Sequence, residues 1–183
     1  MLTSLNNAFF KEEEIGRMRA LGLWLEPSPA PTKLAFAGLM LAPIMEIVVH
    51  DNATTSAEFE TVTKYIRTIE REFALASREK IESIGTDMGL LPMVAGTWTT
   101  EQYSEARSLL AQALNRLSEN DASAVRTAIT REILAVALAG SSHLISIHSL
   151  DREEREMIRE LIRELELDTC VEGMRLLETT TEA

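Results

Sequence analysis

The stretch DREEREMIRELIREL, residues 151–165, decides the fold class of this chain. Its apolar residues recur three and four positions apart, the spacing that places side chains on one face of an α-helix. Asp151 and Glu154 form a capping box, which satisfies backbone N–H groups at a helix start. The Glu and Arg residues between the apolar positions are typical of a solvated helix face, and a partner-binding acidic surface is the alternative. The apolar face consists of Leu150, Met157, Ile158, Leu161, Ile162 and Leu165.

Two further capping boxes predict two further helices. Thr55 with Glu58 opens a helix that ends near residue 73, and Thr99 with Gln102 opens one that ends near residue 117. The first of these is expected to turn one apolar stripe toward the core. That stripe consists of Phe59, Val62, Ile66, Ile69 and Phe73.

The other apolar segments also have helical spacing, and nowhere do apolar and polar residues alternate for long with the period of a strand. We therefore expect an all-α protein without a sheet. The other predicted helices cover residues 2–25, 33–49, 77–85, 122–139 and 171–177.

The segment LAFAGLMLAPIMEIVV, residues 34–49, is the most apolar part of the chain. It contains Pro43 and Glu46 and is shorter than the ~20 residues needed to cross a bilayer. It therefore predicts a helix buried in the protein core, and no membrane span is expected. Before it, PSPAPT at 27–32 ends the N-terminal helix, because proline removes a backbone donor and fixes φ.

Composition indicates one acidic globular domain. The chain has 183 residues, of which 45% are hydrophobic and 26% charged, and 18 Lys and Arg stand against 29 Asp and Glu, a formal charge of −11. This sign disfavours nucleic acid and anionic membrane surfaces as partners. The single cysteine, Cys170, excludes an intrachain disulfide, and the N-terminus lacks the pattern of a secretory signal. We expect a cytoplasmic protein.

The two halves of the chain follow the same plan. In each, an apolar helix leads through a polar loop and a capping box into an amphipathic helix and a short final helix. With Thr55 set against Asp151, Glu58 aligns with Glu154. We expect a single-domain bundle of about seven or eight helices, with pseudo-symmetric halves at 33–85 and 99–178. Residues 1–31 form the N-terminal amphipathic helix and a Pro-rich linker, and 179–183 a frayed tail.

The stretch VVHDNATTSAEFETVTKYIRTIEREFALASREKIESI, beginning at Val48, resembles the recurring unit of the tellurite-resistance TerB-like family, and SLDREEREMIRELIRELELD resembles the same unit again. The resemblance covers residues 32–178 and departs from the family in its loops. Asn52 stands where the family has Gly, and Ile147 and His148 replace the Asp and Gly of the second loop. The resemblance implies an all-helical bundle, a link to tellurite and stress resistance, metal-ion binding and association with resistance proteins. It implies no catalytic reaction and no cofactor other than a divalent metal ion.

One group of residues could hold such an ion. Glu46 and His50 lie four positions apart, hence on one helix face, and Asp51 follows directly. A carboxylate and an imidazole so placed could bind a divalent cation, with Glu58 or His148 completing the shell if the two polar loops meet. The alternative is structural, with Glu46 bonded to His50 or to a neighbouring helix and Asp51 turning the chain.

Three functions remain open from the sequence. The first is a non-enzymatic TerB-like module that acts in stress resistance through protein partners. The second is a metal-dependent enzyme that uses Glu46, His50 and Asp51. The third is a structural homodimer whose N-terminal helix docks on a second subunit.

Overall fold

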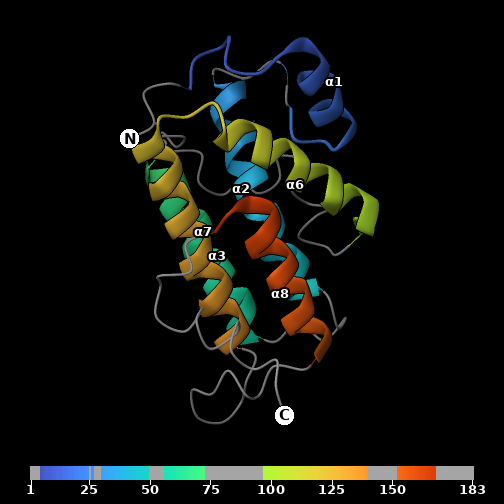
Figure 1. The fold of residues 1–183 in the computed structure, drawn as a ribbon, viewed down its shortest axis with the longest axis vertical. Coiled ribbons are helices and arrows are strands. Elements are labelled where there is room, and N and C mark those ends of the chain that lie inside the picture. Colours follow the sequence, from blue (N-terminus) through green and yellow to red (C-terminus); the bar gives the residue numbers. More distant parts are fainter. Residues whose placement is uncertain are drawn as a thin grey trace.

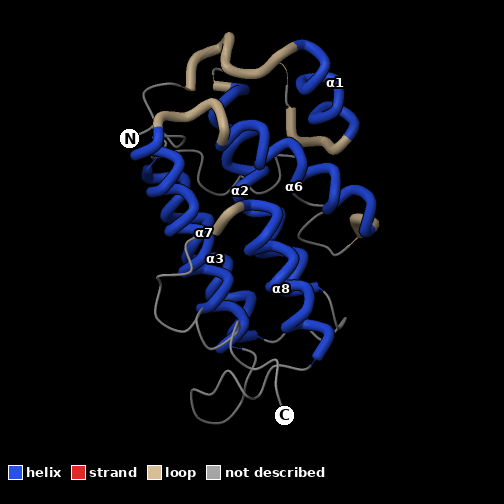
Figure 2. The backbone as a smooth tube through the Cα atoms, in the orientation of Figure 1, coloured by secondary structure: helices blue, strands red, loops and turns tan. Residues whose placement is uncertain are grey.

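The computed structural model describes residues 5–24, 26, 30–49, 56–72, 97–139 and 152–167. These residues form six α-helices and no strand, which confirms the predicted all-α bundle (Figures 1 and 2). The helices are α1 (Glu12–Ala20), α2 (Pro31–Val49), α3 (Ser56–Glu72), α6 (Thr100–Leu114), α7 (Glu119–Ala139) and α8 (Arg152–Leu165).

Helix α2 is the centre of the bundle, because it contacts α3, α6, α7 and α8. Phe36, Leu39 and Ile44 of α2 are fully buried. By length and composition alone α2 could cross a membrane, and 78% of its apolar window is buried inside the protein. As predicted, it is a core helix, and it continues through Pro43.

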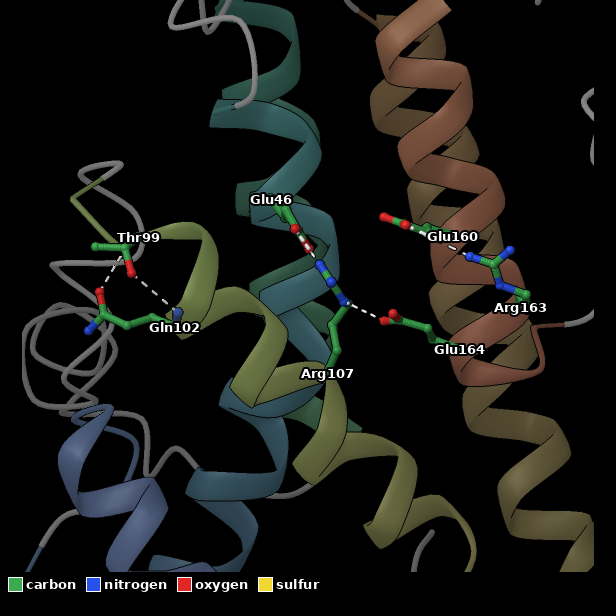
Figure 3. A network of polar contacts seen from close by, with 7 residues as sticks. All are labelled: Glu46, Thr99, Gln102, Arg107, Glu160, Arg163 and Glu164. Atoms are coloured by element: carbon green, nitrogen blue, oxygen red, sulfur yellow. Dashed lines mark hydrogen bonds and ion pairs between the residues drawn. The ribbon is translucent and has the colours of Figure 1, made fainter.

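The predicted capping box of Thr99 and Gln102 is confirmed. At α6, Thr99 Oγ1 accepts a hydrogen bond from the Gln102 N–H at 3.4 Å, and Gln102 Oε1 accepts one from the Thr99 N–H at 2.9 Å (Figure 3). Helix α7 begins earlier than predicted, at Glu119, because Ser118 Oγ accepts a hydrogen bond from the Asp121 N–H at 3.2 Å.

Several predicted features lie outside the described residues. They are the caps Thr55 and Asp151, the short helices at 77–85 and 171–177, Phe73, Cys170 and the tail.

Within the described residues, the amphipathic stripes of α3 and α8 face the core as predicted, except at Phe59. Val62 of α3 is 3% exposed and Ile158 of α8 is fully buried, whereas Phe59 is 56% exposed. The prediction for Phe59 was wrong because the buried face of α3 is centred on Val62, Tyr65 and Ile69. At 3.6 residues per turn, Phe59 lies roughly a quarter of a turn from that centre.

The N-terminal helix is shorter than predicted. Residues 5–11 form turns, in which Asn6 accepts hydrogen bonds from the Ala8 and Phe9 N–H groups, and α1 begins at Glu12. Glu12, Glu13 and Glu14 form the first turn of α1, where the positive end of the helix dipole favours carboxylates. At the far end of the linker, Pro31 is the first residue of α2, a position at which proline costs no hydrogen bond.

Helix α1 ends in a Schellman motif that requires a left-handed residue. The Leu23 N–H bonds to the Met18 carbonyl at 2.8 Å, the Gly22 N–H bonds to the Arg19 carbonyl at 3.0 Å, and Gly22 has φ 75°. Only glycine adopts this conformation without steric cost.

Substitution of Gly16 and of Gly22 by alanine is expected to change the free energy of unfolding in opposite directions. Gly22→Ala is expected to lower the free energy of unfolding by about 1 kcal/mol, because it forces a Cβ into the left-handed region. Gly16→Ala is expected to raise it by about 0.5–1 kcal/mol, because Gly16 lies inside α1 and a Cβ there meets nothing within 4 Å. Urea unfolding of both variants checks the pair, and effects of the same sign would contradict the assignment of the helix end.

Candidate functional site

A buried ion cluster connects three helices of the bundle. It consists of Glu46 on α2, Arg107 on α6 and Glu164 on α8 (Figure 3). The guanidinium of Arg107 donates from Nη1 to Glu46 Oε1 and from Nε to Glu164 Oε2, the latter at 2.7 Å. One arginine therefore holds a carboxylate of each neighbouring helix.

The cluster is buried at its centre and reaches solvent at Glu164. The side chain of Arg107 is 9% exposed and that of Glu46 is 11% exposed, whereas that of Glu164 is 42% exposed. The second oxygen of Glu46, Oε2, is buried and makes no hydrogen bond within the described part of the chain. Removing a charge from water is costly, so this arrangement depends on the pairing of Arg107 with both carboxylates.

Burial raises the pKa of the Glu46 carboxyl above its usual value. The hydrogen bond and charge of Arg107 lower the pKa and only partly offset this effect, and the negative charges of Glu164 and Glu160 raise it further. On α6, burial and the charge of Glu46 raise the pKa of the Tyr103 hydroxyl. The cluster contains two carboxylates, those of Glu46 and Glu164, and one guanidinium, that of Arg107.

Of the five predicted metal ligands, the structure describes Glu46 and Glu58. Glu46 lies in the Arg107 cluster on α2, and the half-buried Glu58 lies in the first turn of α3. His50, Asp51 and His148 lie outside the described residues. Within the described ranges no group of three or more His, Cys, Asp or Glu side chains could hold a metal ion.

The sequence identified Glu46 as a candidate site residue but did not identify Arg107 as its partner. The sequence analysis gave a bond from Glu46 to a neighbouring helix as the structural alternative to metal binding. The ion pair with Arg107 of α6 is such a bond. The sequence did contain a signal for Arg107, since Tyr103, Ala106 and Leu110 place it on the apolar face of α6. A charge on an apolar helix face needs a partner inside the protein, and Glu46 is the carboxylate within the apolar helix α2.

A second charged cluster attaches the N-terminal segment to the bundle. Arg116, which follows α6, donates from Nη1 to Glu14 Oε2 at 2.7 Å, and its guanidinium lies 5.2 Å and 5.7 Å from the ring centroids of Phe9 and Phe10. Burial opposes the charge on Glu14, but the hydrogen bonds from Arg116 and from the Lys11 N–H lower its pKa. Arg17 of α1 pairs with Glu105 of α6. Both clusters therefore join helices by side-chain charges.

A buried tyrosine lies apart from these clusters. Tyr65 of α3 is 4% exposed, and its hydroxyl makes no hydrogen bond within the described part of the chain. Burial, together with the charge of Glu132 on α7, raises the pKa of this hydroxyl. Burial also raises the pKa of Glu132. Helices α3 and α7 pack against each other, so the two groups belong to one helix interface.

The described residues form an all-helical bundle with an apolar central helix and ion pairs between its helices. Comparison with known proteins finds no protein family model, no curated protein and no solved structure that matches this chain.

Proposed function

We propose that the chain is a non-enzymatic helical module that acts in the cytoplasm by binding another protein. The observation that carries this proposal is the pairing of Arg107 with two carboxylates from neighbouring helices. Arg107 is the most buried cation of the described residues. The guanidinium is committed to holding α2, α6 and α8 together. Ion pairs of this kind give a bundle a defined shape, and a defined surface is what a binding module needs.

The resemblance to the TerB-like family suggests the biological process in which the chain acts, which is tellurite or stress resistance. One feature of the bundle supports it. Each proposed half contains an apolar helix followed by an amphipathic one, α2 with α3 and α7 with α8. We propose that the bundle has about seven or eight helices in two pseudo-symmetric halves and that it serves tellurite or stress resistance.

Affinity purification of the tagged full chain from its native cell, with and without tellurite, tests this function. Recovery of a defined partner, together with tellurite sensitivity of a strain that lacks the gene, is the expected result. Arg107→Leu serves as the comparison bait, because loss of the helix ties should reduce partner recovery. Absence of a specific partner, with unchanged tellurite tolerance, would overturn the proposal.

A metal-dependent function is the second candidate, and the unbonded Glu46 Oε2 is the observation that favours it. A divalent ion held at Glu46 is expected to stabilise the fold by about 2.7 kcal/mol when the ion is at a hundredfold excess over its Kd. Thermal unfolding in a series of divalent chlorides measures this. Glu46→Gln is the control, since it should abolish the shift. A melting temperature that is unchanged in all the ions would remove the candidate.

A further inference from the structure

Glu132 of α7 is a half-buried carboxylate without a counter-charge. Burial raises the pKa of its carboxyl, and no neighbouring cation lowers it. Within the described ranges its side chain forms neither a hydrogen bond nor an ion pair. Glu46, the other described carboxyl with a raised pKa, has Arg107 as its partner. Glu132 therefore differs from Glu46 in lacking a cation inside the protein.

Exposed carboxylates on the neighbouring helices are in a different state. Glu60 of α3 pairs with Lys64, and Glu156 of α8 pairs with Arg152, in both cases one turn along the same helix. All four side chains are largely exposed, so water solvates them and a further cation would gain little there. Glu132 is the place where a cation from outside the chain has more to gain.

The physical reason is that folding has already removed part of the water around Glu132. A cation that binds a fully solvated carboxylate must first displace that water, and the cost offsets much of the attraction. At Glu132 part of this cost belongs to folding, and the attraction acts through a medium less polarisable than water. A basic side chain supplied by another molecule is therefore favoured at this position over the exposed carboxylates.

The surface beside Glu132 allows another chain to come close. Helix α7 runs along one side of the bundle (Figure 1). Ala128 lies about one turn before Glu132 and Ala135 about one turn after it, and Ala135 is exposed while Ala128 is half-buried. Because both side chains are methyl groups, neither extends over the carboxylate from its own helix.

A second polar group at the same helix interface also lacks a partner. The Tyr65 hydroxyl of α3 is buried, makes no hydrogen bond in the described part of the chain, and is subject to the charge of Glu132. Buried polar groups in proteins are nearly always satisfied. The interface of α3 with α7 thus contains a carboxylate and a hydroxyl that the described helices leave unsatisfied.

We propose that Glu132 is the docking point for a lysine or arginine side chain of the partner protein, which lies against α7 between Ala128 and Ala135. This inference rests on the proposed function and adds to it the chemistry of the partner, which is a basic segment. The formal charge of −11 attracts such a segment from a distance, and the half-buried carboxylate determines where it binds.

Titration with a basic peptide tests the site on the full chain. The probe is a fluorescein-labelled peptide of three arginines, followed by fluorescence anisotropy. Glu132→Gln and Glu156→Gln each remove one negative charge, so general attraction to the acidic protein changes equally in both. The peptide should bind Glu132→Gln about fivefold more weakly than the natural chain, and Glu156→Gln nearly as well as the natural chain. Equal affinities of the two variants would overturn the proposal.

Amide chemical shifts locate the same peptide on the natural chain without any substitution. The largest changes are expected at residues 128–136 of α7, with smaller ones around Tyr65 of α3. Shifts concentrated on another helix, or spread evenly over the acidic surface, would contradict docking at Glu132.

Affinity purification with the same variants as baits separates this inference from the proposed function. The Glu132→Gln bait should recover severalfold less of the partner than the natural chain, and the Glu156→Gln bait should recover as much. Equal recovery by all three baits would overturn docking at Glu132 and leave the binding function intact. Failure of the natural chain to recover any partner would overturn the proposed function, and the peptide titration would then decide the site alone.

Discussion

Replacement of Arg107 by Leu is expected to lower the free energy of unfolding by about 3–5 kcal/mol at neutral pH. The substitution leaves the carboxylate of Glu46, whose side chain is 11% exposed, without its counter-charge. Glu164 also loses its partner, but its side chain is 42% exposed and water replaces the bond. The loss should therefore come mainly from Glu46. Chemical denaturation followed by circular dichroism measures it.

The double variant Glu46→Leu with Arg107→Leu is the matched control. When both members of a buried ion pair are replaced by apolar residues of similar size, the cost is often small. The double variant should recover most of the stability that Arg107→Leu loses. Equal losses of stability in the single and double variants would mean that Arg107 stabilises the fold by packing. The attraction between its charge and Glu46 would then contribute little.

The pH dependence of the single variant provides a separate check. Burial raises the pKa of Glu46 above 4.5, and removal of Arg107 should raise it further. A carboxyl whose pKa is higher in the folded state stabilises the fold below its unfolded pKa, and this stabilisation is lost as pH rises. The cost of Arg107→Leu should therefore be smallest near pH 4 and should grow toward neutral pH. The addition of Glu46→Gln should remove the difference between the two pH values.

Leu39→Ala is expected to lower the free energy of unfolding by about 2–5 kcal/mol. Leu39 is fully buried in α2, which contacts four helices, so truncation leaves a cavity that no single neighbour can fill. Leu34→Ala is the matched control, since Leu34 lies in the same helix and is only partly buried. Calorimetry should show a clearly smaller loss for Leu34→Ala. A larger loss there than for Leu39→Ala would contradict the central position of α2.

The helices could be predicted from the sequence because their signals are local. Thr99 and Gln102 cap α6 as their spacing predicts, and Ile158 is buried as the period of α8 requires. Phe59 shows the limit of this reasoning, because several faces of α3 fit a spacing of three and four. Packing against α2 and α7 selects one of them, and that choice is not local.

The candidate site was predicted only in part for the same reason. Glu46 stands out within an apolar segment, whereas its partners come from α6 and α8, far along the chain. Nothing in the neighbourhood of residue 46 indicates that α6 packs against α2. The Glu at position 166 is a similar case, since it occupies the left-handed position after α8 with φ 50° and pairs with Arg126 of α7. The sequence there lacks the glycine that usually marks such a helix end.

Hydrogen–deuterium exchange of the full chain in detergent-free buffer tests most directly the claim that an apolar α2 is the centre of a self-contained bundle. The backbone amides of Pro31–Val49 should be among the slowest to exchange, with protection close to the global free energy of unfolding. Rapid exchange throughout α2, while α7 stays protected, would contradict the account.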